Sequence, residues 1–493
     1  MRGFLKGAAA VAVLAITACG NNNTTPAAGD PPSPATATPK NVVFFLGDGY
    51  GIVPMTSTRI YAVGESGELA IDTLPETAFI KTFSKDAQVT DSAPSMSAYM
   101  TGVKMDNGVI SMSADTQAFD TQHQPYVSGA DSTCPATDGT PVTTLLELAV
   151  AAKRSTGVVT TTRITHATPA ATYSHICHRD GENDIATQLV PGGAGYNAKL
   201  GNGVDVVLGG GSRHFVPSTT KGSKRTDTRN LIDEMKAKGY TYVANEAEFT
   251  ALPDTTTKLL GLFTASHMSY DLDRDPTTEP SLAEMTTKAI DILAKNPNGY
   301  FLMVEGGRID HALHETTARK ALQDGKAFDD AMAAALAKVD LKNTLVVVTA
   351  DHDHTMGMNG YSTLTGKTTD TYPGILGLMR DYHEARNADG SAPADITTKA
   401  PKLDANGKPF TTLVFGIGEN RIGGNRNTQP DLTDPQVADK NYHQEAVVQS
   451  GPGGETHGGA DVLLGAAGLG ADQFHGTLDN TKVFDLIKNA VGL

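Results

Sequence analysis

Short apolar runs recur along this chain, each bounded by Gly or Asp and separated from the next by an amphipathic stretch. Runs of this length are typical of strands that are buried on both faces of a sheet. Between them, apolar residues such as Leu282, Met285 and Ala289 recur at spacings of three and four, which predicts helices with one buried side. The sequence therefore predicts an α/β fold in which a mostly parallel central sheet is covered by helices on both faces. We expect strands at residues 42–46, 157–161, 204–208, 300–304, 345–349, 412–415 and 462–464, and helices at residues 143–153, 281–295 and 316–338.

The first residues have the layout of a secretory signal, with Arg2 and Lys6 ahead of an apolar run at residues 8–16. This run is too short to span a bilayer. The Ile-Thr-Ala-Cys motif that ends at Cys19 resembles a bacterial lipobox, in which the cysteine is acylated and becomes the first residue of the mature protein. The alternative is an ordinary cleaved signal followed by an incidental cysteine. Both interpretations predict an exported protein, periplasmic or at the cell surface, and the lipobox also predicts a membrane anchor through a lipid on Cys19.

The chain divides into segments of different composition. We interpret residues 1–18 as the signal peptide and residues 19–40 as a flexible tether, because the tether contains mainly Asn, Thr, Pro, Ala and Gly with almost no apolar bulk. Residues 359–454 are rich in Gly, Pro, Asn and Asp and have few periodic runs, which indicates a large insertion into the main domain.

The charge and the cysteines limit what the chain can bind and where it works. The formal net charge of −15 becomes more negative when the basic signal is removed, so we expect no nucleic-acid binding through a basic face. Beyond Cys19 only Cys134 and Cys177 remain. In an oxidising compartment they either form a disulfide or stay as two separate thiols.

Acidic and histidine side chains stand where three of the predicted strands end. Asp48 follows residues 42–46, Glu305 follows residues 300–304, and the pair Asp351 and His352 comes soon after residues 345–349. The carboxyl ends of strands are where ligands bind in open α/β sheets. Carboxylates crowded into one crevice repel one another unless divalent cations lie between them. A mixed set of histidines and carboxylates favours zinc, whereas a set of oxygen ligands favours magnesium.

Other residues join this pattern only in combination. Asp310 and His314 are four positions apart, so in a helix they share one face and can hold one ion. Taken alone, the Gly-Asp-Gly sequence around Asp48 is usually a turn, and the Asp-Ser-Ala sequence around Ser92 is usually a helix cap. Single histidines such as His352 are more often satisfied core or surface residues than ligands. Only the joint order of these residues along the chain favours a functional site over these ordinary interpretations.

The ordered set of motifs resembles the alkaline phosphatase family over nearly the whole chain after residue 40. The EGGRIDHALHE and ETHGGADV motifs are closer to the vertebrate-type enzymes than to the enteric bacterial type. The resemblance implies a catalytic domain of residues 41–358 and 455–493, a crown-like insertion at residues 359–454, and hydrolysis of phosphate monoesters. The motifs that carry it are NVVFFLGDGYG, TDSAPSMSAYMTGVK, VVTTTRITHATPAATYSHICHRD, DVVLGGG, FLMVEGGRIDHALHE, VVVTADHDH and GGETHGGADV.

The resemblance also assigns metal ligands for two Zn²⁺ ions and one Mg²⁺ ion. It implies that one zinc is held by Asp310, His314 and His457. The second zinc and the magnesium share Asp48, and His354 is expected beside the first zinc without binding it. The remaining ligands implied by the family are Asp351 and His352 for the second zinc, and Thr168 and Glu305 for the magnesium.

Four further residues are implied to act on the substrate. Ser92 is the expected nucleophile, at the start of a helix whose N–H groups and dipole favour a phosphate. Arg179 is expected to hold two phosphate oxygens in its planar fork. His166 and His311 stand where the enteric bacterial type has Asp and Lys. Because imidazoles are mostly neutral at alkaline pH, we expect faster phosphate release, an alkaline optimum and a stronger need for added Mg²⁺.

Three rival functions remain at this stage. Pro94 makes the region after Ser92 look like the start of a sulfatase signature, but Met96 stands where that signature requires Arg. A phosphodiesterase of the same superfamily is disfavoured by Arg179 and the expected magnesium site. A non-catalytic phosphate- or zinc-binding lipoprotein is disfavoured by the presence of Ser92.

The family also implies a homodimer, with the insertion at the dimer interface. A fourth, calcium site is left in doubt, because Asp275 matches one ligand but Thr264 stands where Glu is expected.

Overall fold

The structure is a computed structural model that describes residues 41–383, 385–391, 393–421, 426–468 and 470–493. The predicted signal peptide at residues 1–18, the tether at residues 19–40 and the lipid site at Cys19 lie outside the described residues. The described residues belong to one compact unit.

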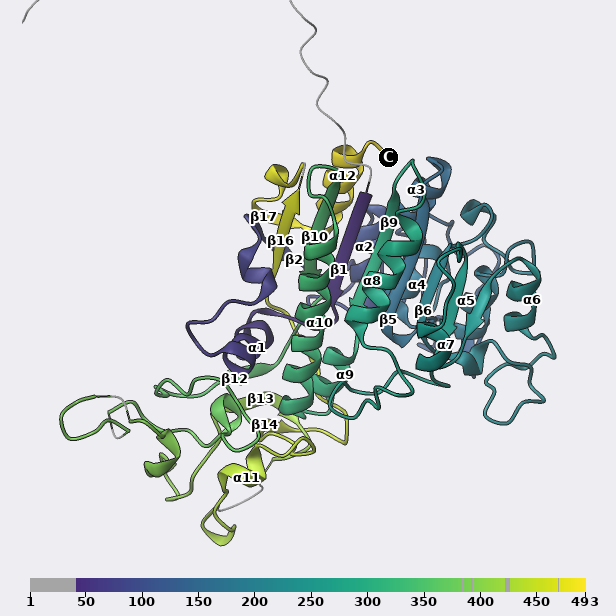
Figure 1. The fold of residues 1–493 in the computed structure, drawn as a ribbon. Coiled ribbons are helices and arrows are strands. Elements are labelled where there is room, and N and C mark those ends of the chain that lie inside the picture. Colours follow the sequence, from purple (N-terminus) through teal and green to yellow (C-terminus); the bar gives the residue numbers. More distant parts are fainter. Residues whose placement is uncertain (1–40, 384, 392, 422–425, 469) are drawn as a thin grey trace, which may run out of the picture. The chain divides into compact units, whose positions relative to one another are not determined.

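A ten-stranded sheet forms the centre of this unit, in the order β17-β2-β16-β10-β1-β9-β5-β6-β8-β7 (Figure 1). Of these ten strands, β16 runs antiparallel to its two neighbours, and every other pair is parallel. The strands are β1 (Asn41–Gly47), β2 (Glu76–Lys81), β5 (Ser155–Arg163), β6 (Val206–Gly210), β7 (Thr241–Val243), β8 (Leu259–Leu262), β9 (Tyr300–Gly306), β10 (Thr344–Ala350), β16 (Val462–Gly468) and β17 (Gly476–Asp479).

Helices cover both faces of the sheet (Figure 1). On one face α1, α10 and α8 pack in succession, and on the other α12, α2, α4 and α3 do so. The helices described are α1 (Ile52–Val63), α2 (Ser92–Thr101), α3 (Leu145–Ala151), α4 (Ala167–Tyr173), α5 (Glu182–Gln188), α6 (Leu231–Ala237), α7 (Glu246–Thr250), α8 (Leu282–Leu293), α9 (Arg308–His314), α10 (Ala318–Lys338), α11 (Asp434–Val437) and α12 (Asn480–Val491).

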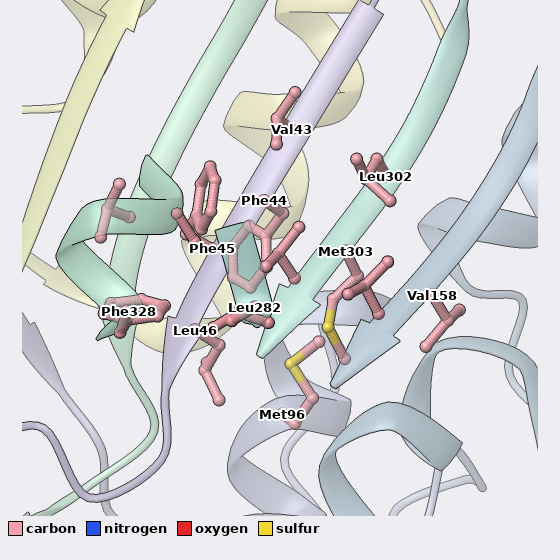
Figure 2. Close-up of a cluster of buried hydrophobic side chains, with 14 of the residues drawn as sticks. Val43, Phe44, Phe45, Leu46, Met96, Val158, Leu282, Leu302, Met303 and Phe328 are labelled. Carbon is pink, nitrogen blue, oxygen red and sulfur yellow. The ribbon is translucent and has the colours of Figure 1, made fainter. Parts of the chain in front are cut away.

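The central strand β1 shows why this sequence forms a sheet covered on both sides. Successive side chains of a strand point to opposite faces. The ring of Phe44 contacts Tyr99 of α2, with ring centroids 5.7 Å apart, whereas Phe45 contacts Phe328 of α10 at 5.9 Å. Figure 2 shows Phe44 and Phe45 within the cluster of buried apolar side chains. Both faces of the strand are therefore core, which explains the uninterrupted apolar run in the sequence.

Most of the predicted elements are present, and the differences are local. Six of the seven predicted strands lie in the central sheet, but the run at residues 204–208 begins its strand only at Val206. The run at residues 412–415 is a strand, β13, but it belongs to a separate sheet. The helix predicted from residue 143 starts at Leu145, because Thr144 forms the N-cap with a capping box to Glu147. The helix predicted from residue 316 starts at Ala318.

Small sheets lie outside the central one. The segment at residues 359–454 contributes β13 and β14 to a three-stranded sheet whose third strand, β12, precedes it. A two-stranded sheet pairs β11 with β15 and so brings His354 beside His457. These strands are β3 (Val127–Ser128), β4 (Asp131–Ser132), β11 (Asp353–His354), β12 (Met356–Met358), β13 (Leu413–Gly418), β14 (Ala446–Gln449) and β15 (His457–Gly458).

Two further observations bear on the sequence predictions. Cys134 and Cys177 form a disulfide, so the paired alternative is the one observed. Within the described residues, no helix has the length and apolar character that crossing a bilayer requires.

Candidate metal centre and nucleophile

Three central strands end together and bring their following residues to one edge of the sheet. Gly47 of β1 pairs in register with Ala350 of β10 and with Gly306 of β9. Because all three strands are parallel, Asp48 and Asp351 both follow the sheet at this edge, and Glu305 is the last residue but one of its own strand. The predicted convergence of these carboxylates is therefore observed.

The first cluster joins Asp310 and His314 of α9 with His457 of β15. The Oδ1 atom of Asp310 lies 3.3 Å from Nε2 of His314 and 3.5 Å from Nε2 of His457. Nδ1 of His314 donates to the Glu455 carbonyl at 2.5 Å, and Nδ1 of His457 donates to the Thr90 carbonyl at 2.8 Å. These bonds leave the two Nε2 lone pairs facing each other at 3.1 Å. A cation between them is the arrangement that removes this repulsion.

His354 lies in the same group but does not present a free nitrogen. Its ligand atoms are within 4.8 Å of those of Asp310, His314 and His457. However, its Nε2 contacts Asp310 Oδ1 at 2.9 Å and its Nδ1 contacts Glu455 Oε2 at 2.6 Å. Burial alone would lower the pKa of His354, but the charge of Glu455 and the bond to Asp310 raise it to about 10. Both nitrogens are therefore bonded to carboxylates, and His354 contacts the cluster through Asp310.

The second cluster contains Asp48, Asp351 and His352. Nε2 of His352 lies 3.3 Å from Asp48 Oδ1 and 3.5 Å from Asp351 Oδ2. Nδ1 of His352 donates to the Asp353 carbonyl at 3.2 Å, which leaves Nε2 with its lone pair. Asp351 Oδ1 accepts from the backbone N–H of Gly49, while its Oδ2 is buried without a hydrogen-bond partner.

The third cluster surrounds the other oxygen of Asp48. Thr168 Oγ1 donates to Asp48 Oδ2 at 3.4 Å. Ligand atoms of Asp48, His166 and Glu305 lie within 4.8 Å of one another. Glu305 Oε2 accepts from hydroxyls of Thr160 and Thr162, but its Oε1 is buried without a partner.

The electrostatics of these clusters fit bound cations. Burial, followed by repulsion from Asp310 and Glu305, raises the pKa of Asp48 well above its usual range. Burial likewise raises the pKa of Asp351 to about 8 and that of Glu305 to about 7. Without cations, burial and mutual repulsion therefore disfavour the ionised forms of these carboxyl groups. The unpartnered oxygens and the facing lone pairs therefore suit two mixed nitrogen and oxygen sites and one site richer in oxygen.

Ser92 is the first residue of α2 and lies beside the second cluster. It is only 2% exposed, and its Oγ is 3.1 Å from His352 Nε2 and 3.3 Å from Asp48 Oδ1. Pro94 is accommodated because it occupies the first helical turn, where a backbone N–H has no intrahelical partner. Ser95 Oγ donates to the Asp351 carbonyl at 2.7 Å, which fixes this helix against the end of β10.

Arg179 is oriented by a partner that the sequence did not identify. One of its terminal nitrogens donates to Asp91 Oδ1, and the other lies 2.9 Å from His166 Nε2. Asp91 precedes α2 as its N-cap residue but makes no side-chain capping bond, so the expected cap is absent. Its Oδ2 accepts instead from the Gly108 N–H. Asp91, which the sequence alone suggests as a helix cap, therefore binds and orients Arg179.

Three imidazoles lie together beside Arg179. The ring centroid of His267 is 4.1 Å from that of His311 and 5.3 Å from that of His166. Burial lowers the pKa of His166 well below its usual range and that of His311 to about 3. Burial therefore favours the neutral form of both imidazoles. Among these three imidazoles, His267 is the one that the sequence reasoning missed, because it belongs to none of the quoted motifs.

The two side chains considered for calcium, those of Asp275 and Thr264, form hydrogen bonds to residues two positions further along the chain. The carboxylate of Asp275 accepts from the backbone and hydroxyl of Thr277, and Thr264 Oγ1 donates to the Ser266 carbonyl.

The fold and these clusters define a class, the metal-assisted hydrolases that carry a serine at a helix N-terminus above a parallel sheet. The alkaline phosphatase family model matches residues 39–493. The chain therefore belongs to the alkaline phosphatase family and is an enzyme of that family.

Relatives of known name agree with the vertebrate-like motifs. The tissue-nonspecific alkaline phosphatase of Felis catus is 36% identical over 484 residues, covering 90% of this chain and 82% of that protein. The human tissue-nonspecific isozyme is 35% identical with the same coverage. The alkaline phosphatase of Gadus morhua is 34% identical over 474 residues and is covered to 90%, as is this chain.

Solved structures show the same fold. The alkaline phosphatase of Thermus thermophilus superposes with a TM-score of 0.63 at 24% identity, covering 92% of each chain. That of the Antarctic bacterium TAB5 superposes with a TM-score of 0.61 at 23% identity, covering 92% of this chain and 99% of the other.

Proposed function

We propose that the chain hydrolyses phosphate monoesters to an alcohol and inorganic phosphate through a phosphoserine intermediate on Ser92. The observation that carries this proposal is the position of Ser92 Oγ, at the start of α2 and within 3.3 Å of both His352 Nε2 and Asp48 Oδ1. A serine in this place faces the carboxylates and imidazoles of the metal centre, and the N-terminus of its helix favours a phosphate.

Two zinc ions and one magnesium ion would be held by the three clusters. A solved variant of the TAB5 alkaline phosphatase, in which a His is replaced by Glu, is described as having Mg bound in its M3 site, and this supports a magnesium site in the present chain. One zinc would be held by Asp310, His314 and His457, and the other by Asp48, Asp351 and His352. The magnesium would be held by Asp48, Thr168 and Glu305. When bound, the ions supply Lewis-acid stabilisation of the attacking and leaving oxygens and lower the pKa of the hydroxyl and of a water.

The protein's own groups orient the reaction. Arg179, held by Asp91, donates two parallel hydrogen bonds to non-bridging phosphate oxygens and places phosphorus in line with Ser92 Oγ. The Oγ–P bond forms as the bond from phosphorus to the ester oxygen breaks, and the alcohol leaves from the opposite side. Water then attacks the phosphoserine, the Oγ–P bond breaks, and phosphate is released. Neutral His166 and His311 add no positive charge to hold the product.

The test compares the wild type with Ser92→Ala on a chromogenic monoester, a diester and a sulfate ester. We expect monoester turnover by the wild type, its loss in the variant, and a mass increment of one phosphoryl group on the peptide that contains Ser92 after acid quenching. The control is Ser174→Ala, since Ser174 is also buried but its Oγ has no partner. Preferred turnover of the diester or sulfate would instead support the rival enzymes, and equal activity of Ser92→Ala would refute the nucleophile.

We further propose that the protein is a homodimer and that it is exported and anchored by a lipid on Cys19. Tyr361 and Leu364 of the insertion are 78% and 73% exposed, which is unusual for large apolar side chains and supports burial against a second copy. Light scattering on the purified protein tests the dimer. Metabolic labelling with a fatty acid in the native host, compared with Cys19→Ala, tests the anchor.

A further inference from the structure

We infer that Glu455 is a positioning residue of the cluster formed by Asp310, His314 and His457. This inference rests on the proposed zinc site at that cluster. Glu455 lies two residues before His457 and is 2% exposed. A buried carboxylate is costly unless its oxygens are paired, so its contacts indicate what it does.

Both side-chain oxygens of Glu455 are used. Oε1 accepts from the backbone N–H of Thr355 at 2.8 Å and from its hydroxyl at 2.5 Å. Oε2 lies 2.6 Å from Nδ1 of His354. The bonds to Thr355 fix the carboxylate, and the fixed carboxylate sets the ring orientation of His354.

His354 passes this constraint to Asp310. Its Nε2 lies 2.9 Å from Asp310 Oδ1, the same oxygen that faces the Nε2 atoms of His314 and His457. A carboxylate held by an imidazole donor has a restricted rotamer, and such outer partners tune metal affinity. Glu455, His354 and Asp310 therefore form a line of hydrogen bonds that ends at the metal centre.

The backbone of Glu455 orients a second residue of the cluster. Its carbonyl accepts from His314 Nδ1 at 2.5 Å, and its N–H donates to the His314 carbonyl at 3.3 Å. The first of these bonds fixes the tautomer that leaves Nε2 of His314 free for a metal. One residue thus orients both Asp310 and His314, and it does so from the segment that follows the insertion at residues 359–454.

The side-chain contribution of Glu455, through His354, can be separated from its backbone contribution, through His314. Substitution changes the side chain and leaves the backbone hydrogen bonds. Glu455→Ala removes the support of His354. Glu455→Gln keeps it, since the amide oxygen still accepts from Thr355 and the amide N–H donates to His354 Nδ1, while His354 Nε2–H still donates to Asp310. A positioning role therefore predicts a loss in the first variant and rescue in the second.

The experiment measures zinc affinity of the apo-protein by competition with a chromogenic chelator, together with kcat and KM. We expect zinc binding at the first site to weaken 10- to 100-fold in Glu455→Ala and to stay within about threefold of wild type in Glu455→Gln. His354→Phe should weaken zinc binding by a similar factor, and this variant provides the test if Glu455→Ala does not fold. The control is Glu147→Ala, because Glu147 is buried and lies 2.7 Å from His175 Nε2 outside the clusters described above.

Unchanged zinc affinity in both Glu455→Ala and His354→Phe would overturn the inference, as would an equal loss in Glu147→Ala. A loss in Glu455→Gln as large as in Glu455→Ala would also overturn it, because charge and not orientation would then be responsible. Failure of the proposed zinc site gives a different result, since the wild type itself would then bind no zinc at this cluster. A wild type that binds zinc here but does not turn over the monoester would refute the proposed hydrolysis and leave the inference about Glu455 standing.

Discussion

Asp324 lies buried in α10 and offers a sharp test of how this fold responds to pH. Its carboxyl group lines a small cavity of about 10 Å³ with Asp271 and Arg274, and it accepts from the Asp271 N–H at 3.3 Å. Burial, reinforced by the charge of Asp271 and opposed by that of Arg308, raises the pKa of Asp324 from 3.8 to about 8. The folded protein therefore holds a proton here at neutral pH that the unfolded chain has lost.

The sign and size of the effect follow from this difference. A raised pKa stabilises the folded state fully below the unfolded value, and the stabilisation is lost as pH rises from about 4 to about 8. Over most of this interval, the loss is about 1.4 kcal/mol for each pH unit. Asp324→Asn resembles the protonated acid at every pH. We expect its free energy of unfolding, relative to wild type, to rise by about 2.7 kcal/mol between pH 5 and pH 7.

The assay is urea unfolding of both proteins at half-unit steps from pH 5 to pH 8, with the same zinc and magnesium concentrations throughout. The pH dependence of metal binding is common to both and cancels in the difference. Asp330→Asn serves as the control, because the side chain of Asp330 is 53% exposed and pairs with Lys326 in the same helix. A difference between wild type and Asp324→Asn that stays constant over this range would refute the reasoning.

Three other variants test separate features. Asp91→Ala should lower kcat/KM by roughly 10- to 100-fold in a chromogenic monoester assay, because Arg179 loses a charge-assisted bond while α2 loses no side-chain cap; an unchanged value would show that Arg179 needs no partner. Replacing both Cys134 and Cys177 by Ser should lower the free energy of unfolding by about 4 kcal/mol in urea without altering kcat, given a sequence separation of 43; loss of activity in the folded variant would contradict this. Thr144→Ala should cost about 1 kcal/mol in the same assay, because α3 loses its N-cap, and a cost near zero would mean that the cap is replaced by solvent.

The strands that the sequence predicted well are those buried on both faces. The run in β1 is apolar on both sides because Phe44 and Phe45 pack against different helix layers. The missed strands lack this signal. In β2, buried and exposed positions alternate over six residues that include Glu and Lys, and β7 has only three residues. β8 is a run of four residues interrupted by Gly261. Pairing with neighbouring strands, and not local composition, forms these strands near the two ends of the sheet.

The residues of the site divide in the same way, into those that a local sequence pattern reveals and those that depend on distant contacts. Asp48 and Asp351 were identified because they follow strands, and strand ends meet by geometry. Asp91 and Glu455 were not identified, because their roles depend on approach to Arg179 and His354, which are 88 and 101 positions away in sequence. For Glu455 a local signal did exist, since it is two residues before His457 in the quoted GGETHGGADV motif.

The central claim is that the first and second clusters each hold one zinc beside Ser92. Anomalous scattering measured at the zinc absorption edge, on crystals of the wild-type protein, tests it directly. The account predicts one peak among Asp310, His314 and His457, and a second among Asp48, Asp351, His352 and Ser92 Oγ. A zinc-saturated crystal with no peak at either position would contradict it.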